Sequence, residues 1–261
     1  EALTEEAKRR GMPAGKGRGL LREYLQVLIL KEIYRLPTAK NFCFTGGTYL
    51  RLVHRTKRFS EDLDFNTPKM SRADFERALS KVHDALKKTG FSVSLDFAHW
   101  QNMLVAELIF PDIEKACGVV SANARKEGIV IKVEVHHPAW NIKTETLVVD
   151  GFGQMFPVVT TDRGALFADK IDALAKKNRA RHLYDILYML TQKYSVDMDV
   201  LKTLGIEDPP FEVILKRVTN YSAAELRRQA ESLRPFLLDE AQADLIVNAP
   251  AIVQQLIGRY R

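Results

Sequence analysis

Apolar residues recur at helical spacing near the start of the chain. The spacing predicts a helix over residues 18–36 that ends before Pro37, with apolar positions at Leu20, Tyr24, Leu28, Ile29 and Ile33. A second helix is predicted from Ser71, an N-capping residue type, to about Lys88, with Gly90 as its stop signal. A short helix is predicted from Thr48 to Val53, directly after Gly46 and Gly47.

Between these helices the pattern changes to short β-prone segments, several of them with apolar and polar residues in alternation. This pattern predicts strands over residues 41–45, 61–66, 91–97, 103–110, 128–136 and 146–149. After about Thr161 the pattern is helical to the end, with breaks at Asn178, Gly205 to Pro210, Pro235 and Pro250. The prediction is therefore an α+β fold: a mixed sheet with flanking helices in a domain over residues 1–160, then a helical bundle over residues 161–261.

The composition is that of an ordinary soluble globular protein. Of the 261 residues, 46% are hydrophobic and 28% are charged, and no apolar run approaches the ~20 residues that span a bilayer. The polar N-terminus does not predict a secretory signal, and the two cysteines fit a reducing cytoplasm. Cys43 lies in an apolar run and is expected to be a small buried hydrophobe. The net charge of +6 favours a polyanionic partner such as RNA or a triphosphate.

The first candidate for chemistry is the run Thr45-Gly46-Gly47-Thr48, which follows a predicted strand. Two glycines let the backbone turn tightly and approach a ligand without obstruction by a Cβ atom. The N–H groups of the following helix, with the Thr48 hydroxyl, could then bind a phosphate. A plain turn is the alternative reading of this run taken alone.

The second candidate is Asp62-Leu63-Asp64, which begins after thirteen further residues. In a strand, residues two apart face the same way, so Asp62 and Asp64 would share one face while Leu63 points into the core. Two adjacent carboxylates repel unless a cation lies between them, and Mg²⁺ binds carboxylate and triphosphate oxygens together. The alternative is a solvated edge strand, which the Gly-Gly-Thr run at this distance disfavours.

Glu134 is the candidate for a third metal ligand or a base. In the predicted strand the branched apolar residues at 131, 133 and 135 share one face, while Lys132 and Glu134 share the other. A glutamate on the polar face of a half-buried strand without a catalytic role explains the same pattern.

A lysine and an aspartate stand out in the helical part. Lys170 lies on the apolar stripe formed by Leu166, Phe167, Ile171 and Leu174, so it must extend to solvent or contact an anion. Asp185 follows among apolar and aromatic neighbours. Two antiparallel helices joined around Asn178 would bring the two side chains together. A helix-surface ion pair remains the alternative.

These segments together resemble the AbiEii/AbiGii-type nucleotidyltransferase toxins, which include the MenT-like enzymes of bacterial toxin–antitoxin systems. The resemblance rests on residues 44–52 (FTGGTYLRL), 58–65 (RFSEDLDF), 170–174 (KIDAL) and 181–186 (RHLYDI), in the family's order. His182 departs from the pattern, because family members often have Arg-Asp at this point.

The resemblance implies a polymerase-β-like nucleotidyltransferase core followed by a helical part. It implies that Gly46, Gly47 and Thr48 hold an NTP, that Asp62 and Asp64 bind Mg²⁺ or Mn²⁺, that Lys170 contacts the NTP phosphates, and that Asp185 completes the site. The activity it implies is transfer of a nucleoside monophosphate to RNA, at the 3′ end of tRNA, by a cytoplasmic toxin with a cognate antitoxin. Basic residues flank both motif regions and could contact RNA phosphates: Arg55, Lys57, Arg58, Lys176, Lys177, Arg179 and Arg181.

Two other hypotheses stay open at this point. The same chemistry could modify a small molecule or a protein side chain, as antibiotic adenylyltransferases and protein AMP-transferases do. Alternatively, the chain could be a non-catalytic interaction protein on an inherited fold, although the joint presence of Asp62, Asp64 and Lys170 argues against that.

Overall fold

The computed structural model describes residues 2–9, 11, 15–100, 103–119 and 128–260. The chain divides into two compact units, which we call the sheet unit (Glu1–Pro138 and Thr144–Thr160) and the helical unit (Ala139–Lys143 and Thr161–Arg261). Each unit is described separately. Among the described residues, no helix is both long and apolar enough to cross a membrane.

Within the described residues the sheet has seven strands in the order β3-β4-β5-β2-β1-β7-β6. It is mixed: β2 runs parallel to β5 and β1 parallel to β7, whereas β1–β2, β3–β4 and β4–β5 are antiparallel pairs. The strands are β1 (Cys43–Thr45), β2 (Leu63–Asn66), β3 (Ser94–Phe97), β4 (Met103–Phe110), β5 (Ile129–His136), β6 (Thr144–Gly151) and β7 (Gln154–Thr161).

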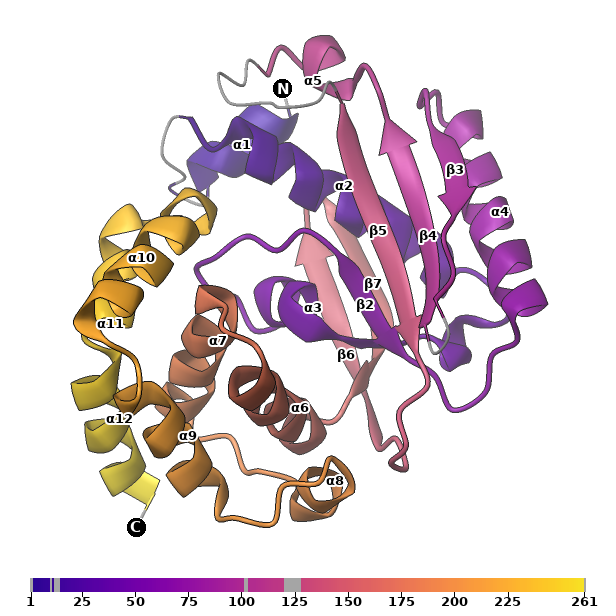
Figure 1. The fold of residues 1–261 in the computed structure, drawn as a ribbon. Coiled ribbons are helices and arrows are strands. Elements are labelled where there is room, and N and C mark those ends of the chain that lie inside the picture. Colours follow the sequence, from indigo (N-terminus) through magenta and orange to yellow (C-terminus); the bar gives the residue numbers. More distant parts are fainter. Residues whose placement is uncertain (1, 10, 12–14, 101–102, 120–127, 261) are drawn as a thin grey trace. The chain divides into compact units, whose positions relative to one another are not determined.

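Helices α2 (Gly17–Tyr34) and α4 (Arg72–Lys88) pack against each other, and both contact the sheet. Figure 1 shows α4 alongside β3 and β4, with which it also makes contact. Alternation within β5 explains the two faces of the sheet, because Ile131, Val133 and Val135 are buried while Lys132, Glu134 and His136 are only half-buried. The apolar face packs into the core, and the other face carries the half-buried polar side chains. Shorter helices of this unit are α1 (Ala2–Arg9), η1 (Ala39–Asn41), α3 (Gly46–Leu52) and α5 (Ile113–Ala116).

In the helical unit, α6 (Arg163–Lys176) and α7 (Ala180–Thr191) are the central pair, and the other helices pack around them. Asp162 caps α6 by accepting hydrogen bonds from the N–H groups of Gly164 and Ala165. The remaining helices are α8 (Met198–Thr203), α9 (Pro210–Thr219), α10 (Ala223–Leu233), η2 (Arg234–Phe236), η3 (Glu240–Ala243), α11 (Asp244–Val247), α12 (Ala249–Ile257) and η4 (Gly258–Tyr260).

The predicted mixed sheet with flanking helices and a helical C-terminal region is confirmed, with local corrections to its elements. Strand β7 was missed, and β3 begins at Ser94 instead of residue 91. Helix α3 begins at Gly46, so the two glycines form its first turn and do not precede it. Strand β2 begins at Leu63, two residues later than predicted, which leaves Asp62 outside the strand.

Candidate active site

Two carboxylates meet across neighbouring strands on the polar face of the sheet. Asp64 of β2 and Glu134 of β5 are direct register partners in the parallel pair. His136 follows two residues after Glu134 and faces the same way. One donor atom from each of Asp64, Glu134 and His136 lies within 4.8 Å of the other two, a spacing that suits a metal ion. We call these three residues the Asp64 cluster.

Gly46, in the Gly-Gly-Thr run, leaves room for the Asp64 carboxylate of this cluster. Its backbone has φ +79, in the left-handed region that favours glycine, and a Cβ atom at this position would overlap the Asp64 carboxylate. A Cβ on Gly47 would lie 2.6 Å from Arg58 Nη2 and 2.7 Å from Ser60 Oγ. Gly46 is therefore required by its backbone conformation and by the Asp64 carboxylate, and polar side chains also approach Gly47 closely.

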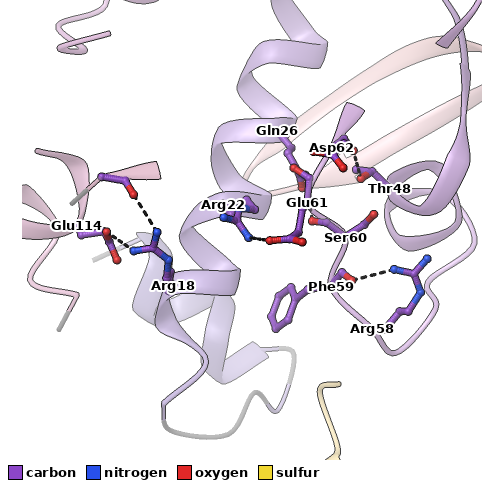
Figure 2. A network of polar contacts seen from close by, with 11 residues as sticks. Arg18, Arg22, Gln26, Thr48, Arg58, Phe59, Ser60, Glu61, Asp62 and Glu114 are labelled. Carbon is purple, nitrogen blue, oxygen red and sulfur yellow. Dashed lines mark hydrogen bonds and ion pairs between the residues drawn. The ribbon is translucent and has the colours of Figure 1, made fainter. Parts of the chain in front are cut away.

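The segment just before β2 is held by side chains from two helices (Figure 2). Gln26 of α2 donates from Nε2 to the carbonyl oxygens of Ser60 (3.1 Å) and Glu61 (3.0 Å). Thr48 of α3 donates its hydroxyl to the carbonyl oxygen of Asp62. Because these carbonyls accept from side chains, the backbone at 60–62 does not pair as a strand. This accounts for the late start of β2, and it gives the Thr48 hydroxyl a partner within the protein.

A buried ion pair joins α3 to α2 beneath this segment. Arg51 donates from Nε to Glu23 Oε2 at 2.6 Å, and from Nη1 to the carbonyl oxygen of Thr56 at 2.7 Å. Both side chains are almost fully buried. An arginine that donates two hydrogen bonds to one buried carboxylate has little freedom to move. Helix α2 therefore supports α3 and the loop that follows it.

Asp62 lies beside the cluster without being one of its three members. The nearby ammonium of Lys132 is hydrogen-bonded to Glu107 of β4 at 3.0 Å. That bond is the main cause of the raised pKa of Lys132, and the charges of Asp62 and Glu134 raise it further. Asp62 and Glu134 therefore act on the same cation, so Asp62 adds negative charge to this end of the sheet.

The donor set fits a divalent cation. The Asp64 carboxylate lies in the space that a Cβ atom on residue 46 would fill. Its register partner on the neighbouring strand, Glu134, carries a second carboxylate. Two carboxylates in this arrangement repel each other, and a cation between them removes the repulsion. Asp64 and Glu134 would hold it.

In the helical unit the structure brings Lys170 and Asp185 together. Lys170 of α6 and Asp185 of α7 form an ion pair with Nζ and Oδ2 3.0 Å apart. Asp185 has none of its surface exposed and Lys170 only 7%. The alternative of an ion pair on the helix surface is therefore wrong, because both charged groups are buried and compensate each other.

His182 lies one turn before Asp185 on α7 and is also buried, with 7% of its surface exposed. Neither ring nitrogen has a hydrogen-bond partner within the part of the chain that the structure describes. Burial, helped by the positive charge of Lys170, lowers the pKa of His182 to about 3. The imidazole is consequently neutral at physiological pH. This is the position at which the sequence departs from the family pattern.

The basic residues chosen as RNA contacts differ in their exposure. Lys57, Lys176, Lys177 and Arg179 are exposed, Arg181 is half-buried, and Arg55 lies on the surface 3.6 Å from Asp150. Arg58 is 3% exposed and donates to the carbonyl oxygen of Phe59. A buried guanidinium cannot present itself to RNA, so we leave Arg58 out of the RNA surface.

His136 is the site residue that sequence reasoning missed. The period-two alternation that selected Lys132 and Glu134 extends to His136, so the signal was present in the strand pattern. What the pattern lacked was the parallel pairing of β5 with β2, which brings this face of β5 next to Asp64.

The chain shares its fold with solved structures of nucleotidyltransferases, and its family is one of nucleotidyltransferase toxins. The structure resembles MenT4, a nucleotidyltransferase toxin from Mycobacterium tuberculosis H37Rv, with a TM-score of 0.62 and 16% identity over 98% of this chain and 88% of that one. It also resembles JHP933 from Helicobacter pylori, with a TM-score of 0.56 and 16% identity over 93% of each chain. A comparison with curated proteins gives no match. The chain belongs to the family described as nucleotidyl transferase AbiEii toxin, Type IV TA system, whose model matches residues 28–247.

Proposed function

We propose that this toxin transfers a nucleoside monophosphate from an NTP to the 3′ end of tRNA, in a reaction that depends on a divalent metal ion and releases pyrophosphate. The observation that carries the proposal is the pairing of Asp64 with Glu134 beside a glycine that leaves room for the carboxylate. Membership of a nucleotidyltransferase toxin family supports it.

The reaction is a displacement at phosphorus. The oxygen of the terminal ribose hydroxyl attacks the α-phosphorus of the NTP, the bond from that phosphorus to the β-phosphate oxygen breaks, and pyrophosphate leaves with the bonding electrons. Glu134 is our candidate to accept the hydroxyl proton, because its carboxylate lies in the Asp64 cluster. Asp62, beside the cluster, adds negative charge that favours a bound cation.

Asp64 and Glu134 would hold a divalent ion, which would lower the pKa of the attacking hydroxyl and stabilise negative charge on the phosphates. Mg²⁺ and Mn²⁺ both match the carboxylate oxygens. Gly46 and Gly47 allow the NTP to approach the backbone of the first turn of α3, with Thr48 as the next residue of that turn. Because the Thr48 hydroxyl donates a hydrogen bond to the backbone carbonyl oxygen of Asp62, we assign Thr48 a positioning role.

Lys170 and Asp185 are proposed to act in the same reaction. A lysine ammonium neutralises charge on the triphosphate, and a buried aspartate paired with it holds that ammonium in one orientation. The 3.0 Å ion pair supports this assignment, since it holds the Lys170 side chain in one place.

The acceptor is proposed to be RNA because cations that are exposed or half-buried flank both motif regions. The proposed contacts are Arg55, Lys57, Lys177, Arg179 and Arg181. Contacts of this kind to phosphates depend on salt concentration. A cognate antitoxin is the expected second partner, since the family consists of toxin–antitoxin toxins. The cytoplasm, where NTPs and tRNA occur, is the proposed location.

The test is incubation of the full chain with each labelled NTP and total tRNA, for wild type, Asp64→Asn and Asp96→Asn. Asp96 is an exposed aspartate of β3 and serves as the matched control. We expect label at the tRNA 3′ end, release of pyrophosphate, and a loss of about 100-fold or more in Asp64→Asn, because a lost metal ligand removes several kcal/mol of transition-state stabilisation.

Periodate treatment of the tRNA, which destroys the terminal diol, should abolish labelling. Label that persists after this treatment would contradict the 3′ end as acceptor. Label in protein or in a small molecule, with none in RNA, would replace the RNA proposal by one of the two other acceptors. Equal activity of wild type and Asp64→Asn would contradict the role of the Asp64 cluster.

A further inference from the structure

The Asp64 cluster contains the imidazole of His136, which has no role in the reaction proposed above. His136 is half-buried at the end of β5 and faces the same way as Glu134. Among the described residues, neither the His136 ring nor the Asp64 carboxylate makes a hydrogen bond or an ion pair. Both groups are therefore available as ligands, and their donor atoms lie within 4.8 Å of each other and of Glu134.

We infer that His136 is a ligand of the same divalent ion as Asp64 and Glu134, and that this makes the site selective for Mn²⁺ over Mg²⁺. The inference rests on the proposed function only for the requirement that a divalent ion binds here. It concerns this chain's own donor set: two carboxylates and one ring nitrogen.

The chemistry of the donors decides the preference. Mg²⁺ is a hard ion that prefers six oxygen ligands at about 2.0–2.1 Å and gives up its water slowly. An imidazole nitrogen is a weaker ligand for Mg²⁺ than the oxygen it would replace. First-row transition ions accept imidazole readily, and Mn²⁺ is the member of that series that also suits carboxylate, water and phosphate oxygens. Adding a histidine to two carboxylates therefore shifts the balance towards Mn²⁺.

The geometry allows three ligands on one ion. Ligands on opposite sides of an ion are about 4.4 Å apart when each bond is about 2.2 Å, and adjacent ligands are closer. The observed limit of 4.8 Å between donor atoms is near this span, so small side-chain rotations suffice to complete the site. Parallel pairing keeps the two strands in register, with Asp64 opposite Glu134 and Asn66 opposite His136.

His137 provides a matched control. It is the next residue after His136, and its Nε2 lies 3.0 Å from the carbonyl oxygen of Met70, to which it is hydrogen-bonded. His137→Gln removes an imidazole one position away without touching the cluster.

The experiment uses the full chain with Mn²⁺ alone, without NTP, and has two readouts. The first is pulsed electron paramagnetic resonance of bound Mn²⁺, which detects a directly coordinated ¹⁴N. We expect this coupling in wild type and in His137→Gln, its replacement by ¹⁵N coupling after labelling with ¹⁵N-histidine, and its loss in His136→Gln. The second is calorimetric binding of each ion. His136→Gln should weaken Mn²⁺ binding about tenfold or more and Mg²⁺ binding less than about threefold.

Absence of nitrogen coupling in wild type would overturn the inference, and so would coupling that survives in His136→Gln. Should His136→Gln fail to fold, His136→Asn replaces it, and the isotope exchange in wild type still reports whether a histidine binds the ion. Nitrogen coupling in a wild type that transfers no nucleotide would refute the proposed function alone. Nucleotide transfer with Mg²⁺ and no nitrogen coupling would refute the His136 inference alone.

Discussion

The buried ion pair between Lys170 and Asp185 makes the sharpest prediction about stability. Lys170→Met keeps the length of the side chain and removes its charge, which leaves the Asp185 carboxylate uncompensated with none of its surface exposed. Removing one partner of a buried pair costs about 3–5 kcal/mol. Asp185→Asn should cost a similar amount or somewhat less, because the lysine stem can extend its charge towards solvent.

The double variant Lys170→Met/Asp185→Asn should cost at least about 2 kcal/mol less than the sum of the two single changes, since no unpaired charge remains in it. The control is Lys176→Met in the same helix. Its partner Asp172 is 2.7 Å away, but 61% of the Lys176 side chain is exposed, so the change should cost no more than about 0.5 kcal/mol.

Urea unfolding, followed by the fluorescence of Trp140, measures these differences. Trp140 belongs to the helical unit, as the ion pair does, and Trp100→Phe removes the signal of the sheet unit at a residue that is 69% exposed. Single variants that each lose less than about 1 kcal/mol, or a double variant whose loss equals the sum, would refute the reasoning. A loss of tRNA labelling in Lys170→Met that leaves stability unchanged would separate a catalytic role from a structural one.

Three further predictions concern Gly46, His182 and the RNA surface. Gly46→Ala should lower the free energy of unfolding at least about 1 kcal/mol more than Gly153→Ala and weaken metal binding. Both glycines have positive φ, but only the Cβ at Gly46 meets another residue, the Asp64 carboxylate, so equal losses would contradict the close approach. Because the pKa of His182 falls from 6.5 to about 3 on folding, the unfolded chain binds a proton that the native chain excludes, and stability is lost as the pH falls below 6.5. Wild type should therefore lose about 2 kcal/mol more than His182→Gln between pH 7 and pH 5 in urea unfolding, and parallel profiles would show that the imidazole is not desolvated. Lys57→Gln should lower the salt slope of tRNA binding by about 0.7–0.9, in a filter-binding series, whereas an unchanged slope would remove Lys57 from the RNA surface.

Local sequence pattern predicted most of the elements that carry the site. Helix α2 and helix α4 follow from apolar spacing and, for α4, from the cap at Ser71, whose side chain accepts a hydrogen bond from the Asp74 N–H. Strand β7 was missed although its last residues are buried, because Pro157 and the exposed Met155 obscure its alternation. A strand held between two others can keep an irregular sequence, since its neighbours supply the pairing.

The start of β2 shows where local pattern fails. Asp62 continues the alternation of Asp64, and a strand that includes both is the natural reading. In the structure the carbonyl oxygens at 60–62 accept hydrogen bonds from Gln26 and Thr48, which are distant in sequence. Backbone groups take the strongest available partners, and side chains brought close by the fold compete with a neighbouring strand for them.

What the sequence determined by itself was the residue chemistry and its local geometry: a glycine pair, two aspartates two residues apart, and a lysine on an apolar stripe. These follow from short-range spacing, because the periods of helix and strand are properties of the backbone alone. Only the tertiary structure decided which groups meet. The parallel pairing of β2 with β5 joins Asp64 to Glu134 and His136, and the packing of α6 on α7 joins Lys170 to Asp185. Such contacts form between residues 15 to 72 positions apart, and they depend on burial of the whole core, which no local window of sequence contains.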